Sequence, residues 1–312
     1  LLVPLDGSSQ AECILPRVRA LAPLSDHRVI LTRIVSRARS SGELTEDPVQ
    51  WRQNAQDVKT YLHTMARQLR QEDFTVKTIV RGRRPAEQIA HIAQTERVDL
   101  TLLRPSGAGK AHQRATNTGR TAQQLLNDRG TSTLLDRSPP KATSQGYQRV
   151  LVAWDGSPRA EWTLLRVAML LSHSGGHMFV LHQEQETEAP EKPWVDLAET
   201  NSALLPPRLQ HPLQAFDIQP HGVRLPEPDG PLRQRLVDLV QNVDIDLAAF
   251  WSTPNPRGKA PAVDWLAQAV LEDCSCSLLL APEPHRSEAM EVMVGDEQIP
   301  TPRRTGISAS AY

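Results

Sequence analysis

The chain has 312 residues, enough for about two domains, and its 35 Lys and Arg residues almost balance 36 Asp and Glu residues. The net charge of -1 excludes a global field that would recruit nucleic acid or an anionic membrane, and the 4% of aromatic residues offer no platform for stacking single-stranded bases. No apolar run approaches the roughly 20 residues of a spanning helix, so we expect no membrane partner. Three cysteines, an odd number, fit a reducing, cytoplasmic compartment.

Strand and helix patterns alternate through residues 1–135. The first strand, residues 1–5, is apolar without alternation, as expected for a strand that is buried on both faces. Ser8 or Ser9 can cap a helix that runs through residue 22. The elements expected next are strand 29–35, helix 48–71, strand 74–80, helix 85–94, strand 100–103, helix 118–128 and strand 131–135. This alternation predicts a parallel sheet with helices on both faces.

A second series begins after a proline-containing linker, residues 138–146. The prolines of segment 184–213 forbid a long regular helix there and leave room for a short one within 194–204. Residues 283–312 are polar and patternless, and we expect a flexible tail. The elements expected in this series are strand 150–154, helix 158–172, strand 178–182, strand 216–223, helix 230–241, strand 247–251, helix 262–272 and strand 277–280.

The second series repeats the first. The sequence LVPLDGS at residues 2–8 returns as LVAWDGS 149 residues later, and VDLTLL at 98–103 returns as IDLAAF 147 residues later. This period is too long for a solenoid unit and suits a whole domain. We therefore expect two tandem domains, 1–137 and 147–282. A linker of about ten residues is short, so they should pack as one pseudo-two-fold unit.

These repeated residues resemble the universal stress protein family. An apolar strand that ends in Asp-Gly-Ser, followed by a helix and by a strand ending at Arg33-Ile34-Val35, is typical of that family, and the resemblance covers both domains. It implies two tandem α/β domains of about 140 residues, each an open sheet of five parallel strands with a flavodoxin-like, adenine nucleotide alpha hydrolase-like fold. Family dimers often pair through their fifth strands, so we expect contact between strands 131–135 and 277–280.

Family members that bind ATP carry Gly-x2-Gly-x9-Gly-Ser/Thr after the fourth strand, where glycines let backbone N–H groups approach phosphates. In the first domain Arg104 stands at the first Gly position, Gly107 at the second, and Gly119 follows after eleven residues instead of nine. The loop stays basic, so the resemblance leaves open one nucleotide or anion site. Its candidate residues, of which the first three would flank base and ribose, are Pro4, Asp6, Ile34, Arg104, Ser106, Gly107, Gly109, Lys110, Gly119, Arg120 and Thr121.

The second domain departs further from the nucleotide-binding pattern. Trp251 stands at the first Gly position, and Asp264-Trp265 replaces the final Gly-Ser. A carboxylate repels phosphate at a helix N-terminus, and an indole fills space that the family pattern keeps open. Trp154 adds bulk beside the crevice at the carboxyl ends of the strands, where the resemblance places a nucleotide. We expect no ATP site here and tryptophans that fill the former pocket or an interface.

The remaining motifs indicate structure instead of chemistry. A Walker A pattern across residues 104–111 fails at its first Gly and at its Ser/Thr position. Cys274 and Cys276 are expected to be buried thiols, since no second Cys/His cluster completes a zinc site. His173 and His177 bracket a turn, and His182 ends a strand, so we assign no metal ligand and no catalytic residue.

The resemblance and the degenerate motifs predict a non-enzymatic universal stress protein that acts in stress response as a regulatory or scaffold module. One alternative is an ATP- or AMP-binding member with a single nucleotide or anion site in the first domain. A second alternative is a weak ATPase that uses the loop 104–120. The expected partner is the other domain of the same chain, and a homodimer and an unidentified protein partner stay open. The candidate cofactors are ATP and AMP.

Overall fold

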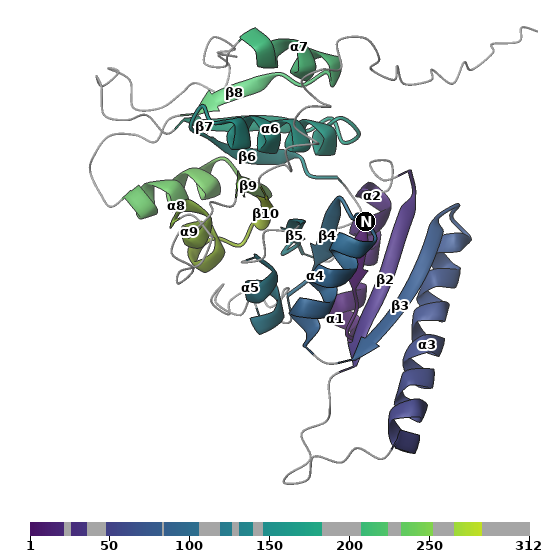
Figure 1. Cartoon of the computed structure of the whole chain (residues 1–312). Helices are drawn as coiled ribbons and strands as arrows, with labels where there is room; N and C mark the ends of the chain where they lie inside the picture. The colour runs from purple at the N-terminus through teal and green to yellow at the C-terminus, as the bar shows by residue number, and fades with distance from the viewer. Residues whose placement is uncertain are drawn as a thin grey trace, which may run out of the picture.

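The protein is described by a computed structural model over residues 1–21, 26–35, 48–82, 84–105, 119–126, 131–139, 146–182, 207–223, 232–251 and 265–282 (Figure 1). We call β1–β5 with their helices the N-terminal half, and β6–β10 with theirs the C-terminal half. The elements of the N-terminal half are β1 (Leu2–Pro4), α1 (Ser9–Glu12), α2 (Leu15–Leu21), β2 (Arg28–Val35), α3 (Pro48–Arg70), β3 (Thr75–Gly82), α4 (Pro85–Thr95), β4 (Leu100–Leu103), α5 (Arg120–Leu126) and β5 (Ser132–Leu135). Those of the C-terminal half are β6 (Arg149–Trp154), α6 (Pro158–Leu171), β7 (His177–His182), α7 (Pro207–Ala215), β8 (Pro220–Val223), α8 (Leu232–Asn242), β9 (Leu247–Trp251), α9 (Trp265–Asp273) and β10 (Ser277–Ala281).

All ten strands form one sheet in the order β3-β2-β1-β4-β5-β10-β9-β6-β7-β8. Neighbouring strands within each half are parallel, as Leu2 opposite Ile30 and Val150 opposite Leu247 illustrate. At the centre β5 and β10 pair antiparallel, with Leu278 opposite Leu135. The prediction that the two fifth strands meet is therefore confirmed. Each half repeats the other outward from this seam, ending in β3 beside α3 and in β8 beside α7 (Figure 1).

The central strands are buried at every residue, namely in β4, β5, β9 and β10. Their apolar runs show no alternation because helices cover both faces of the sheet. The edge strand β3 instead alternates between exposed and less exposed positions, and it carries Lys77 and Arg81. Charged side chains on an edge strand oppose pairing with another sheet. The sequence prediction of a buried parallel core is confirmed.

Two elements differ from the sequence prediction. The helix expected through residue 22 is split into α1 and α2, because Pro16 has no N–H and Ile14 instead donates to the carbonyl of Ala11 at 3.2 Å. The strand expected at 216–223 is only β8, since α7 runs to Ala215 and a turn follows it. The short helix expected within 194–204 and the tail 283–312 lie outside the described residues. Among the described helices, none is both long and apolar enough to cross a membrane.

Candidate functional site

The repeated Asp-Gly-Ser sequence forms the same turn at the carboxyl ends of β1 and β6. The Oδ1 of Asp6 accepts from the backbone N–H of Ser8 at 2.8 Å and from its hydroxyl at 2.6 Å. Ser8 Oγ in turn accepts from the N–H of Ala11 at 3.1 Å and so caps α1. Gly7 adopts a φ of +81°, which other residues reach only with strain. The motif is therefore a capped turn, whether or not a ligand binds beside it.

The C-terminal half builds this turn from Asp155, Gly156 and Ser157. Asp155 Oδ1 accepts from the N–H of Ser157 at 2.8 Å, and Ser157 Oγ accepts from the N–H of Ala160 at 3.2 Å. Gly156 has a φ of +78°. Asp6 and Asp155 thus share a structural role, which accounts for their recurrence without nucleotide chemistry.

The two turns differ in what lies above the glycine. A Cβ built on Gly7 would clash with Arg33 Nη1, whereas a Cβ on Gly156 would meet nothing within 4 Å. The Arg33 guanidinium thus lies against the N-terminal turn, and its Cζ is 5.3 Å from the centre of the Tyr61 ring. Burial raises the pKa of the Tyr61 hydroxyl, and the nearby negative charge of Glu12 adds to the shift. The crevice side of this turn therefore holds a polar cluster, which we call the Arg33 cluster: Asp6, Glu12, Arg33 and Tyr61.

The positions predicted to flank a nucleotide base lie at the same edge of the sheet as the Arg33 cluster. Pro4 and Ile34 are half-buried on adjacent strands, with Pro4 opposite Thr32. Ile34 packs against the hydrophobic core. Asp6, Pro4 and Ile34 lie at this edge together with Arg33, which the sequence pattern did not single out. The sequence offered only a weak signal, a basic residue two positions before the end of β2.

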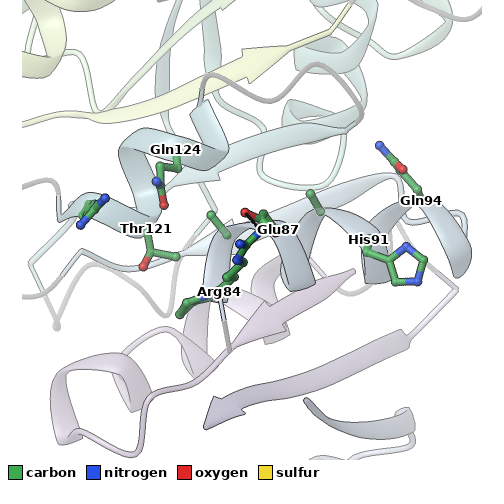
Figure 2. A pocket seen from close by; sticks show the side chains of 10 residues that line it. Arg84, Glu87, His91, Gln94, Thr121 and Gln124 are labelled. Atoms are coloured by element: carbon green, nitrogen blue, oxygen red, sulfur yellow. Dashed lines mark hydrogen bonds and ion pairs between the residues drawn. The ribbon is translucent and has the colours of Figure 1, made fainter. Parts of the chain in front are cut away.

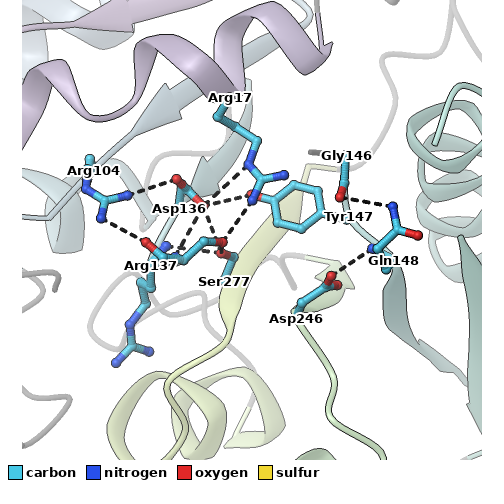
Figure 3. A network of polar contacts seen from close by, with 10 residues as sticks. Arg17, Arg104, Asp136, Arg137, Gly146, Tyr147, Gln148, Asp246 and Ser277 are labelled. Carbon is cyan, nitrogen blue, oxygen red and sulfur yellow. Dashed lines mark hydrogen bonds and ion pairs between the residues drawn. The ribbon is translucent and has the colours of Figure 1, made fainter. Parts of the chain in front are cut away.

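Arg104 lies elsewhere than expected. Its side chain is only 1% exposed, its Nη1 lies 3.1 Å from Asp136 Oδ2, and its Nη2 donates to the carbonyl of Ser138 at 2.8 Å (Figure 3). A side chain so buried and paired cannot reach an anion in the loop that follows β4. The prediction placed Arg104 at the loop because the sequence alone could not show that Asp136 is its partner.

Asp136 is the centre of a buried polar network where the two halves meet. Besides Arg104, its carboxylate faces the Arg17 guanidinium at 3.7 Å, and it accepts from the hydroxyls of Tyr147 at 3.2 Å and Ser277 at 3.1 Å. Arg17 also lies 3.9 Å from the centre of the Tyr147 ring. Burial raises the pKa of Tyr147, and the Asp136 charge adds to this. We call these five residues the junction network (Figure 3).

The glycine-containing loop is represented by its end only, since Ser106, Gly107, Gly109 and Lys110 lie outside the described residues. Gly119, with a φ of +76°, offers its carbonyl to the N–H of Gln123 at 3.1 Å at the start of α5. Arg120 and Thr121 follow it on the first turn. They lie where the prediction placed them, at the start of the helix that follows β4.

Arg120 and Thr121 line a groove of about 770 Å³ between α4 and α5. Figure 2 shows Arg84, Glu87, His91 and Gln94 along one wall and Thr121 and Gln124 on the other. Arg84 forms an exposed ion pair with Glu87 at 3.1 Å. The groove has basic residues at one end, beside the first turns of both helices, and this arrangement can accept an anion.

In the C-terminal half the indoles of Trp154 and Trp251 are buried in the core. Both were expected to fill space, and they do so at the carboxyl ends of β6 and β9. The segment with Asp264 and the side chain of Trp265 are not described. Cys13, Cys274 and Cys276 are free thiols, the last two buried as expected, and no group of three potential metal ligands occurs among the described residues.

Comparison with known proteins finds a family that resembles the first part of the chain and solved structures that share its fold. The model of the universal stress protein family matches residues 1–128. No curated protein matches the chain. A universal stress protein from Archaeoglobus fulgidus is 13% identical, with 91% of this chain and 98% of that chain covered and a TM-score of 0.68. A functionally unknown protein from Pseudomonas aeruginosa is 14% identical over 94% of this chain and 96% of its own, with a TM-score of 0.60. These structures share the fold of this chain, and residues 1–128 are similar to the universal stress protein family.

Proposed function

We propose that this chain is a non-enzymatic universal stress protein in which two paired domains, 1–137 and 147–282, act as a regulatory scaffold in the cytoplasmic stress response. The observation that carries the proposal is the Arg33 guanidinium lying against Gly7. A nucleotide base that approached this turn would have to displace a charged side chain from its ring contact with Tyr61.

Two further observations support a scaffold. Arg104 is committed to Asp136 and so is withdrawn from the loop. The C-terminal crevice carries buried Trp154 and Trp251 at its strand ends. What remains is a ten-stranded unit that presents two outer helical surfaces, which suits binding to a protein partner or to a second copy.

Calorimetric titration of ATP and AMP onto the intact chain tests this proposal. We expect no saturable binding at micromolar nucleotide in the wild type. Arg33→Ala removes the guanidinium but leaves the Asp6 turn, so it should improve any residual binding. Arg159→Ala, which removes a basic residue near the start of α6 in the C-terminal half, is the control. Tight binding of ATP by the wild type, abolished by Asp6→Ala, would overturn the scaffold proposal.

A second candidate function is an anion or nucleotide site in the N-terminal half, which the groove between α4 and α5 favours. Arg84, Arg120 and Thr121 would hold phosphate oxygens in this groove. Sulfate, AMP and ATP titrations separate this candidate from the first. Weakened binding in Arg120→Gln, unchanged binding in Arg159→Gln and weakening by salt would support it. Phosphate release above background would be needed before an ATPase is considered.

A further inference from the structure

Three basic side chains lie at the amino ends of the outer strands of the C-terminal half. Arg149 begins β6, His177 begins β7, and His221 is the second residue of β8. Arg149 pairs with His177 in the parallel register, and His221 pairs with Phe179, two positions further along β7. Since paired residues and residues two apart share a face of the sheet, the three side chains lie on one face. This edge of the sheet is opposite the one that carries the Asp155 turn, and the groove between α4 and α5 is in the other half.

The ring of Phe179 holds these side chains together. His221 stacks on it with 5.3 Å between the ring centres, and the Arg149 Cζ lies 5.7 Å from its centre. The rings of His177 and His221 are 5.6 Å apart, centre to centre. Phe179 is buried, Arg149 and His221 are half-buried, and His177 is exposed. We call Arg149, His177 and His221 the outer basic cluster, which is thus anchored on the core and open to solvent on one side.

Two nitrogen atoms of the outer basic cluster lack a hydrogen bond. Arg149 Nε and His221 Nδ1 are buried and have no partner among the residues that the structure describes. A guanidinium does not lose its proton in a protein, so Arg149 Nε keeps an N–H that needs an acceptor. His221 Nδ1 is likewise a donor in one neutral tautomer and in the protonated ring. Because buried donors are normally paired, these two indicate an acceptor that the described residues do not supply.

The positive charge of the outer basic cluster is also left without a counter-charge. Burial lowers the pKa of His221, and the neighbouring His177 and Arg149 lower it further, because both are basic groups that disfavour a second positive charge. The carboxylate of Asp246 accepts from the backbone N–H of Arg149 at 3.1 Å and thus serves the main chain. An anion at this face would be attracted by the guanidinium and by each imidazole that carries a proton.

The N-terminal half neutralises the corresponding basic residue within the chain. β2 and β3 pair as β7 and β8 do, which puts Lys77 at the position of His221. Lys77 Nζ lies 2.6 Å from the Glu96 carboxylate. The 147-residue offset of the repeat puts Val243 at the position of Glu96, and Val243 packs against the core. The C-terminal half thus lacks the carboxylate that pairs with this position in the N-terminal half.

We propose that the outer basic cluster binds a phosphate group, either as the free ion or on a small molecule. The planar guanidinium of Arg149 presents parallel N–H donors that match two phosphate oxygens. His177 and His221 add ring N–H donors from the neighbouring strands. Phosphate supplies both the acceptors that Arg149 Nε and His221 Nδ1 lack and the negative charge that the cluster lacks. It enters from the exposed side, past His177.

Calorimetric titration of inorganic phosphate onto the intact chain at neutral pH and low salt tests the proposal. We expect saturable binding that is weakened about tenfold in Arg149→Gln and partly restored in Arg149→Lys, which keeps the charge but not the planar fork. Arg120→Gln, which removes a basic residue from the groove of the N-terminal half, is the matched control and should leave this binding unchanged. No saturable binding, or a loss in Arg120→Gln without one in Arg149→Gln, would overturn the proposal.

A titration with glycerol 3-phosphate identifies the source of the phosphate group. Tighter binding than that of inorganic phosphate, lost in Arg149→Gln, assigns the site to a phosphorylated small molecule. Equal or weaker binding assigns it to the free ion.

Nuclear magnetic resonance of the histidine rings locates the bound phosphate in the wild-type chain, without a substitution. The ring nitrogen signals of His177 and His221 should shift together and saturate with the midpoint of the calorimetric curve. His91, which lines the groove, is the internal control and should shift no more than in sodium chloride of the same ionic strength. Shifts at His91 alone, or shifts no larger than those in sodium chloride, would overturn the proposal. Broadening of the His177 and His221 signals by Ni²⁺ without a response to phosphate would also overturn it, because the pair would then be a metal site.

Discussion

The N-terminal and C-terminal halves share their turns and differ in what surrounds them. Both halves cap the first helix through Asp-Gly-Ser. In the C-terminal half a further aspartate, Asp246, accepts from the N–H groups of Gln148 and Arg149 at 2.7 and 3.1 Å. Residues that recur in both halves are therefore explained by architecture alone.

The differences concentrate at the crevice and at the seam. Only Gly7 is covered by a guanidinium, while Gly156 stands open. The junction network takes Arg17, Arg104 and Asp136 from the N-terminal half, whereas the C-terminal half supplies Ser277. A tandem arrangement allows this asymmetry because each half has its own sequence. Function is thus better sought where the halves differ than where they agree.

The largest loss of stability should come from a substitution in the junction network at the seam. Asp136→Ala leaves Arg17 and Arg104 buried without their carboxylate, which should lower the free energy of unfolding by about 3–5 kcal/mol. Asp155→Ala, which removes an exposed carboxylate from a turn, should cost only about 1 kcal/mol. Urea unfolding of both variants makes the comparison. Equal losses would mean that the junction network does not stabilise the fold.

A smaller difference in stability should distinguish substitutions at the two turn glycines. Ala at either position must adopt a positive φ, which costs about 1–2 kcal/mol. Gly7→Ala should cost more than Gly156→Ala, because its Cβ also displaces Arg33. In an Arg33→Ala background the two costs should become equal. Chemical denaturation of the four glycine variants measures these costs. If Gly7→Ala still cost more than Gly156→Ala in the Arg33→Ala background, Arg33 would not be the cause of the difference.

The capping serines should behave alike. Ser8→Ala and Ser157→Ala each remove one side-chain acceptor from a helix start, and each should lower stability by about 1 kcal/mol. Ser8→Thr and Ser157→Thr keep the acceptor and serve as controls. Thermal unfolding measures both losses. A large loss of stability in one Ser→Ala variant and none in the other would mean that the two turns do not have the same role.

The smallest effect should appear at alkaline pH. Burial raises the pKa of Tyr61 and of Tyr147 above the value of about 10 expected in the unfolded chain. Their contribution to stability is fully present below pH 10 and falls as the pH rises towards the folded-state pKa. Tyr147→Phe and Tyr61→Phe should each weaken this alkaline loss, measured as the free energy of unfolding against pH. If the free energy of unfolding fell with rising pH as steeply in both variants as in the wild type, the two tyrosines would not be the cause of the alkaline loss.

Much of the fold could be predicted from the sequence because it depends on local patterns. Apolar runs such as β4 and β9, the Asp-Gly-Ser turns and the pairing of the fifth strands all follow from periodicity, turn chemistry and the family resemblance. The α1–α2 break was missed although Pro16 signalled it. Arg33 and Arg104 could not be placed because a long side chain can reach several neighbours, and only tertiary packing selects Gly7 for one and Asp136 for the other. The groove between α4 and α5 is likewise a tertiary feature that no linear motif marks.

We expect that neither crevice holds an adenine nucleotide, the N-terminal one because Arg33 lies against its turn. Mass spectrometry of the small molecules released from protein purified without added nucleotide tests this directly. We expect no ATP or AMP above the level released from an unrelated protein carried through the same purification. Release of about one equivalent of adenine nucleotide per chain, lost in Asp6→Ala but not in Asp155→Ala, would contradict the claim and place a working site in the N-terminal half.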